Sequence, residues 1–169
     1  RLLSVKNGYS AIKTGAISAF SSVSRVAMLK QLRLRFPSLA GFFEEMYLGH
    51  PLTDHGPRIL CSCKDGGKVR VVWNREGTTQ GDPAGPMLFA MALRPAVHAV
   101  QDALGVGVYA LAYVDGVFLR VPTPTVAEAL RTTRQVLMTK CNLPLQLKKC
   151  HVYHPPDQDL SADFTKGHE

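Results

Sequence analysis

A polar corner just before an apolar run holds the residues best suited to chemistry. Gln80 lies between two glycines, Gly77 and Gly81, which permit unusual backbone torsions and the close approach of a ligand. Asp82 is a favoured helix cap, and Pro83 suits a first helical position because its missing N–H would be unpaired there. The free N–H groups and the dipole of such a helix end favour an anionic partner such as a phosphate. The sequence therefore predicts a rigid polar loop at a helix N-terminus.

Cysteines are the other residues whose spacing could carry chemistry. The chain has four of them, Cys61, Cys63, Cys141 and Cys150, and their spacing matches no standard zinc motif. Cys61 and Cys63 alternate with their neighbours in a strand-like run, which would place both thiols on one face. We interpret the cysteines as buried free thiols rather than metal ligands, and nothing indicates a disulfide-rich secreted protein.

Charge and length restrict the classes of protein further. The 169 residues include 20 Lys and Arg against 13 Asp and Glu, a formal net charge of +7. This balance suits a polyanionic partner, since neutralising phosphates releases counterions, although solubility also favours a net charge away from zero. No run of about 18 apolar residues exists, so we expect no membrane span. The chain begins with Arg in mid-pattern, and we expect one domain or a piece of one.

Helices are predicted at four places that could position the corner. They cover residues 24–36, 38–48, 84–103 and 125–140. Ser24 is expected to cap the first of these helices, and Pro95 to kink or restart the third. Thr125 with Glu128 three residues later matches a capping box for the fourth.

Strands are predicted in two hairpins and one further run. They cover residues 58–63 with 68–74, residues 108–113 with 117–121, and residues 144–153. Asp115 and Gly116 at the tip of the second hairpin form a good type I′ turn, which requires no metal ion. Together these elements predict an α/β (α+β) fold in which helices back an antiparallel sheet.

The corner and the helix that follows it resemble a known family. Gly-Thr-Thr-Gln-Gly-Asp-Pro followed by Gly-Pro-Met-Leu-Phe-Ala, at residues 77–90, is similar to the Gln-Gly-Asp-Pro block of reverse transcriptases. The similarity is greatest to those of non-LTR retrotransposons, which include site-specific elements. In that family the block lines the nucleotide and template pocket of the polymerase palm. The resemblance implies that Gln80, Gly81 and Asp82 contact nucleotide or template.

The tip of the second hairpin resembles the Tyr-x-Asp-Asp box of the same family. Tyr113 and Asp115 match the box, and Gly116 replaces its second aspartate. In the family these carboxylates help to hold two Mg²⁺ ions, which prefer hard oxygen ligands. The resemblance implies that Asp115 is a catalytic metal ligand and that Tyr113 lies beside the nucleotide.

Residues 18–25 resemble the Asn-Ala-Phe-Asn-Ser-Val-Ser-Arg stretch of these elements. The family carries an aspartate three residues before that stretch, where this chain has Gly15, which offers no ligand atom. The backbone carbonyl of Ala16 is then expected to face a metal. Phe20 takes the place of the aromatic residue that blocks a ribose 2′-hydroxyl, unless it is an ordinary core side chain. A second possible register places Ser4 at the aspartate position.

A fourth block, at residues 143–150, resembles a strand of the family that ends in Lys-Cys. Lys149 takes the position of a lysine proposed to reach the incoming triphosphate, although a surface lysine would look identical. The blocks occur in the family's order across residues 15–155. We therefore expect a reverse transcriptase palm core there, with partial fingers and a loose tail at residues 156–169.

The resemblance implies an RNA-directed DNA polymerase that uses Mg²⁺, an RNA template, a DNA primer and deoxynucleoside triphosphates. The remainder of a retrotransposon polyprotein would be its partner. Because glycine replaces two of three expected carboxylates, at Gly15 and Gly116, we expect this copy to have little or no activity. A non-catalytic basic module that binds RNA or primer–template is one alternative. An unrelated α/β domain, in which Gly15 and Asp115 lie far apart, is the other.

Overall fold

The computed structural model describes residues 8–49, 58–62, 69–79 and 81–154, and the chain divides into two compact units. The first unit comprises Arg1–Ile17 and Leu93–Glu169, and the second comprises Ser18–Ala92. Helix α4 (Gly85–Leu104) contributes residues to both.

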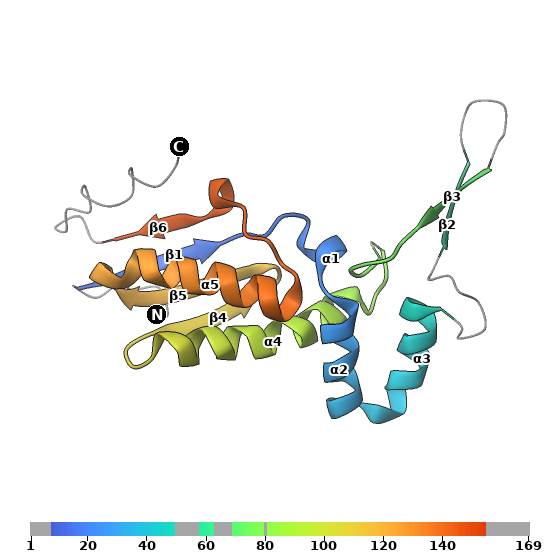
Figure 1. The fold of residues 1–169 in the computed structure, drawn as a ribbon, viewed down its shortest axis with the longest axis horizontal. Coiled ribbons are helices and arrows are strands. Elements are labelled where there is room, and N and C mark those ends of the chain that lie inside the picture. Colours follow the sequence, from blue (N-terminus) through green and yellow to red (C-terminus); the bar gives the residue numbers. More distant parts are fainter. Residues whose placement is uncertain (1–7, 50–57, 63–68, 80, 155–169) are drawn as a thin grey trace. The chain divides into compact units, whose positions relative to one another are not determined.

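The first unit is built on a four-stranded antiparallel sheet (Figure 1). Its order is β4-β5-β1-β6, so β1 and β5 are central and β4 and β6 form the edges. The strands are β1 (Tyr9–Thr14), β4 (Tyr109–Tyr113), β5 (Gly116–Pro122) and β6 (His151–Tyr153). Buried Val117, Leu119 and Val121 alternate with less buried residues along β5, as expected for a sheet with one face in the core, and Ile12 is buried on β1.

The hairpin of β4 and β5 has a tighter turn than the sequence indicates. Tyr113 pairs with Gly116, so Val114 and Asp115 form a two-residue loop. Val114 has a φ of 54°, whereas neither Asp115 nor Gly116 has a positive φ. This pattern is that of a type II′ turn, because a type I′ turn needs positive φ at both central residues. The type I′ interpretation is therefore wrong, and Gly116 already belongs to β5.

Helix α5 (Val126–Cys141) confirms the fourth predicted helix but not its capping box. A short 3₁₀ turn, η1 (Thr123–Thr125), precedes the helix and uses the Thr125 hydroxyl, which donates to the carbonyl oxygen of Pro122 at 2.8 Å. The Thr125 side chain therefore accepts no hydrogen bond from the first turn of α5. Val126, Ala129 and Leu137 form the buried face of this helix.

The predicted strand over residues 144–153 is wrong for most of its length. Only β6 is a strand, and Leu145 forms an isolated bridge with Ala16. Between them the chain turns through the 3₁₀ helix η2 (Leu147–Lys149), where the N–H of Lys149 donates to the carbonyl oxygen of Gln146 at 2.8 Å. This local turn satisfies backbone groups that a strand would have paired with β1.

The second unit contains three helices, a hairpin and the start of α4. The elements are α1 (Ala19–Ser22), α2 (Arg25–Arg35), α3 (Pro37–Leu48), β2 (Arg58–Ser62) and β3 (Val69–Trp73). Ser24 caps α2 as predicted, since its hydroxyl accepts from the N–H of Ala27 at 3.2 Å. β2 and β3 pair antiparallel in the predicted hairpin, whose loop lies outside the described residues.

Helix α4 runs without interruption from Gly85 to Leu104 and does not restart at Pro95. Proline removes one N–H donor from a helix interior. Leu93, Ala96 and Val100 are nonetheless buried around that position, and this packing offsets the lost hydrogen bond. No helix among the described residues is long and apolar enough to cross a bilayer. The predicted fold class, helices packed with an antiparallel sheet, is confirmed.

Candidate functional site

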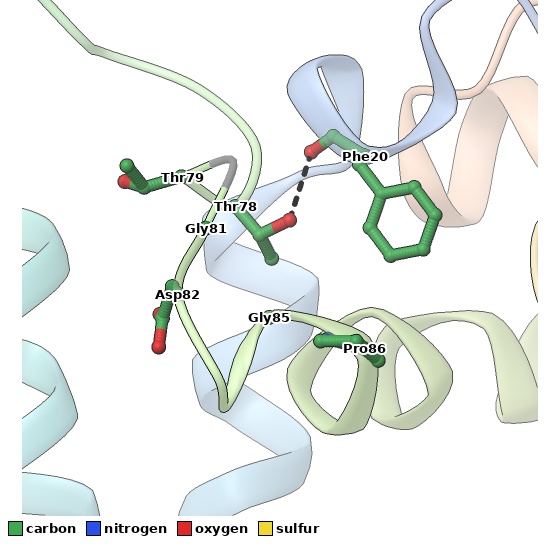
Figure 2. Close-up of a pocket in the computed structure, with 7 residues that line it drawn as sticks. All are labelled: Phe20, Thr78, Thr79, Gly81, Asp82, Gly85 and Pro86. Carbon is green, nitrogen blue, oxygen red and sulfur yellow. Dashed lines mark hydrogen bonds between the residues drawn. The ribbon is translucent and has the colours of Figure 1, made fainter.

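A pocket of about 250 Å³ lies in the second unit at the corner that the sequence singled out (Figure 2). Its lining comes from α1, from the loop after β3 and from the start of α4. The lining residues are Phe20, Thr78, Thr79, Gly81, Asp82, Gly85 and Pro86. Gln80 lies outside the described residues. The pocket thus joins two blocks about 60 residues apart in the sequence, and its lining is mainly apolar.

The loop is tied to α1 by backbone hydrogen bonds. The N–H of Thr78 donates to the carbonyl oxygen of Phe20 at 2.7 Å, and the N–H of Gly77 donates to that of Val23 at 3.0 Å. The Thr78 hydroxyl adds a longer bond to the same Phe20 oxygen (Figure 2). Gly77 has a φ of 67°, and a Cβ on it would lie 2.3 Å from the Phe20 oxygen. Glycine is required at position 77 because the chain's own backbone, not a ligand, makes the close approach.

Arg25 holds the other side of this loop. Its guanidinium is buried and donates to four backbone carbonyl oxygens, at 2.7 to 3.2 Å; these belong to Tyr47, Asn74, Glu76 and Gly77. It also lies 5.2 Å from the centroid of the Tyr47 ring. Burial lowers the pKa of Arg25 from its ordinary value. A single cation thus joins α2, the end of α3 and the loop.

Tyr47 connects α3 to Asp82 on the pocket rim. The phenol of Tyr47 is 1% exposed and donates a hydrogen bond to the Asp82 carboxylate. Burial, followed by this hydrogen bond, raises the pKa of Tyr47 to about 12. The other carboxylate oxygen of Asp82 accepts from the N–H of Ala84 at 2.9 Å. Asp82 is therefore held by contacts on both sides.

The start of α4 is less suited to an anion than the sequence indicated. Asp82 caps the turn before the helix, because its side chain accepts from Ala84 and its carbonyl oxygen accepts from Gly85 at 3.0 Å. Pro83 and Pro86 have no N–H to offer. The carboxylate and the carbonyl oxygen of Asp82 thus accept from two N–H groups that a phosphate at this helix end could otherwise use.

Phe20 has the packing expected of a core side chain and also lines the pocket. Its ring packs on the buried ring of Phe89, with centroids 4.6 Å apart, and it also lines the pocket. The core interpretation therefore holds for one face of the ring. The other role, a block to a ribose 2′-hydroxyl, stays a prediction.

The hairpin tip in the first unit carries the second set of expected site residues. Thr14 pairs with Val117 at the end of β1, so Gly15 and Gly116 lie at the same end of neighbouring strands. A Cβ on Gly116 would lie 3.6 Å from the Thr14 carbonyl oxygen. Asp115 is adjacent and exposed, as is Tyr113. This arrangement agrees with the register that assigns Gly15 to the aspartate position, whereas Ser4 lies outside the described residues.

The residues at this end of the sheet do not fit a pair of Mg²⁺ ions. Among Gly15, Asp115 and Gly116, only Asp115 has a carboxylate, and the two glycines offer no side-chain ligand atom. The Ala16 carbonyl oxygen accepts from the ammonium of Lys149 at 3.5 Å, the outer limit of a hydrogen bond. Within the described part of the chain, no three His, Cys, Asp or Glu side chains could hold a metal together. A two-metal centre needs several oxygen ligands from the protein.

Cys141 and Cys150 form no disulfide, in agreement with the free-thiol interpretation. Cys141 is buried, and burial raises the pKa of its thiol to about 11. Cys150 is partly buried, and its Sγ donates to the carbonyl oxygen of Gln146 at 3.4 Å. Cys63 lies outside the described residues.

Comparison with known proteins places this geometry in a family. The family model "Reverse transcriptase (RNA-dependent DNA polymerase)" matches residues 16–165. The chain belongs to the reverse transcriptase family. The alternative of an unrelated α/β domain is therefore excluded, and the family expected from the four sequence blocks is confirmed. No curated protein matches the chain.

Solved telomerases share the fold of this reverse transcriptase chain. The apo enzyme of Candida tropicalis, truncated from its C-terminal domain, has a TM-score of 0.66 at 9% identity over 89% of this chain and 31% of that one. Another apo structure from C. tropicalis has a TM-score of 0.63 at 8% identity, over 88% and 29%. Telomerase of Candida albicans, solved with the TWJ fragment of telomeric RNA, has a TM-score of 0.54 at 12% identity, over 97% and 29%. The chain thus spans under a third of these proteins.

Sequence reasoning missed the residues that support the pocket. Arg25 was noted only as part of a motif, and Tyr47 and Thr78 were given no role. Their partners are mainly backbone carbonyl and N–H groups, which leave no trace in a sequence. One signal was available in the spacing. Arg25 lies three, four and seven residues before Met28, Leu29 and Leu32, which places an arginine on the apolar side of the helix, where it is rare.

Proposed function

We propose that the chain is the palm region of an RNA-directed DNA polymerase that retains its nucleotide-facing wall and has lost the metal site of catalysis. The pairing of Thr14 with Val117 carries this proposal, since it brings Gly15 and Gly116 to one end of the sheet. In the family these are aspartate positions. With Asp115 alone, the chain lacks the oxygen ligands that two Mg²⁺ ions require.

The pocket in the second unit supports the retained part of the function. A cavity of about 250 Å³ lined by the Phe20 ring, two threonines and Asp82 suits part of a nucleotide. We propose that Phe20, Gly81 and Asp82 line the nucleotide and template pocket with Gln80, and that Tyr113 and Lys149 lie near the nucleotide. In this assignment both compact units belong to one reverse transcriptase domain, which the family match at residues 16–165 supports.

Template and primer are the proposed macromolecular partners. The net charge of +7 favours binding to phosphates, and one telomerase of the same fold was solved with an RNA fragment. The similarity of residues 77–90 to retrotransposon sequences favours an origin in a non-LTR element, with the rest of a polyprotein as partner.

The loss of the metal site favours a second function, a module that binds RNA–DNA hybrid without extending it. Primer extension with Mg²⁺ or Mn²⁺, followed in parallel with hybrid binding, tests both proposals. We expect binding that weakens steeply between about 50 and 200 mM salt, without extension. Efficient extension would contradict the loss of catalysis. Absence of salt-dependent binding would contradict a retained nucleic-acid function.

A further inference from the structure

The space beside Gly15 is already filled by the chain itself. A Cβ added to Gly15 would lie 2.7 Å from the Cβ of Lys149 and 3.3 Å from its carbonyl oxygen. Real Cβ atoms essentially never make the first of these contacts. The Cβ of Lys149 is fixed to the backbone, so rotation of the lysine side chain cannot relieve the contact. Any side chain at position 15 requires the η2 turn to move.

Backbone hydrogen bonds hold the η2 turn in this position. The N–H of Gln146 donates to the carbonyl oxygen of Gly15 at 2.9 Å, and the N–H of Ile17 donates to that of Pro144 at 2.9 Å. The turn itself closes through the N–H of Lys149 and the carbonyl oxygen of Gln146. Moving Lys149 away from Gly15 would therefore break or strain several bonds at once.

The Lys149 side chain continues from this contact to the next residue of the chain. Its Cδ lies 3.5 Å from the position of an added Gly15 Cβ, and its ammonium reaches the Ala16 carbonyl oxygen. That oxygen is the backbone group expected to face a metal. An ammonium there is a positive charge where a divalent cation would otherwise be attracted.

We infer that Lys149 blocks the half of the metal site at Gly15 and Ala16: its backbone and Cβ exclude a carboxylate at position 15, and its ammonium takes the Ala16 carbonyl oxygen. This inference rests on the proposed function in treating Gly15 as the family's first aspartate position. It predicts that aspartates restored at 15 and 116 are insufficient while Lys149 is present.

Position 116 provides a contrast. A Cβ on Gly116 would lie 3.2 Å from the edge of the Phe118 ring. Its next neighbours, at 3.6 Å, would be at ordinary van der Waals distance. A ring edge can yield by a few tenths of an ångström, whereas the backbone-fixed Cβ of Lys149 cannot. The obstacle to restoring the two carboxylates is therefore concentrated at position 15.

A double-mutant cycle in the intact protein tests the contact independently of catalysis. Gly15→Ala is measured by urea unfolding in the native background and with Lys149→Gly, which removes the obstructing Cβ. We expect Lys149→Gly to reduce the cost of Gly15→Ala by about tenfold in the unfolding equilibrium constant. Lys148→Gly, on the same turn, is the matched control and should leave that cost unchanged. Equal costs in all three backgrounds would overturn the inference.

Binding of Mn²⁺ alone, followed by electron paramagnetic resonance, tests the cation site. The Gly15→Asp/Gly116→Asp protein is compared with the same protein carrying Lys149→Ala or Lys149→Gly. Lys149→Ala removes the ammonium but keeps the Cβ, so we expect it to bind Mn²⁺ more tightly than the Lys149 form and more weakly than Lys149→Gly. We expect about a tenfold difference between the extremes, the order of coupling seen between contacting residues. Equal affinity in the three proteins would overturn the inference.

These outcomes are separable from a failure of the proposed function. If the unaltered protein extends primers, the proposed loss of catalysis is wrong whatever the cycle shows. If the cycle shows no coupling while the unaltered protein remains inactive, the inference about Lys149 fails and the proposed function stands.

Discussion

Arg25 donates from Nε to the carbonyl oxygen of Gly77 at 2.9 Å, and this buried bond fixes the start of the loop that leads into Gln80. The same guanidinium binds carbonyl oxygens at the end of α3 and at two further loop positions. The pocket rim is therefore held by a cation on one side and by the backbone of α1 on the other.

Replacing Arg25 should destabilise the protein severely. Arg25→Met leaves several carbonyl oxygens without their donor, and each buried orphan costs about 1–3 kcal/mol. We expect a loss of about 3 kcal/mol or more in the free energy of unfolding, measured with urea. Arg25→Lys should recover only part of it, because a lysine lacks the planar fork of donors. Arg35→Met, at an exposed site on the same helix, is the control and should change stability little.

Gly77 and Gly81 form a matched pair for a second test. Both have positive φ, but a Cβ at Gly77 would lie 2.3 Å from backbone atoms, whereas one at Gly81 would meet nothing within 4 Å. Gly81→Ala should cost about 1–2 kcal/mol, the penalty of a left-handed conformation. Gly77→Ala should cost several times as much and weaken binding of a fluorescent nucleotide. Equal effects of the two substitutions on thermal unfolding would contradict the close approach seen here.

Replacing Val114 with glycine should stabilise the protein. A β-branched residue with a φ of 54° is strained, and this side chain is 57% exposed, so its packing contributes little. Val114→Gly should raise the free energy of unfolding by about 1 kcal/mol, the net of relieved strain and greater unfolded-state entropy. Val106→Gly is the control, because Val106 is fully exposed and its φ is not positive. This substitution should lower the free energy of unfolding slightly.

Tyr47 should make stability depend on alkaline pH. Its pKa in the folded protein is raised to about 12, above the ordinary value of 10.0, so the folded state holds its proton more tightly than the unfolded state. The contribution is fully present below about pH 10 and is lost as pH rises from there to about 12. Urea unfolding at a series of pH values should show this decline. Tyr47→Phe should remove the contribution of this phenol to the fall in the free energy of unfolding with pH. The same fall in the variant would contradict the buried, hydrogen-bonded phenol.

The fold could be predicted where its signals are local. The α2 helix was recognised because Ser24 caps it, and the hairpins were recognised because turn residues separate β-prone runs. Strand β1 (Tyr9–Thr14) was not recognised, because it is ordered by pairing with β5 and β6, which lie more than 100 residues away in the sequence. Residues 144–153 were misassigned because two long-range hydrogen bonds, from Gln146 to Gly15 and from Ile17 to Pro144, position the 3₁₀ turn, and no local pattern reveals them.

The site could be predicted in part for the same reason. Motif spacing predicts site positions at Gly15, Gly116 and the corner around Gln80, and the structure pairs the ends of β1 and β5 as that prediction requires. It could not identify Lys149 as the neighbour of Gly15, since that contact exists only once the η2 turn forms. Nor could it show that the capping residue Asp82 is held from the other side by Tyr47.

The tie between the loop and α1 has a dynamic consequence. At four residues, α1 is far too short to be helical on its own. Its order depends on the hydrogen bonds from Gly77 and Thr78, so the aromatic floor of the pocket and its rim form and open together.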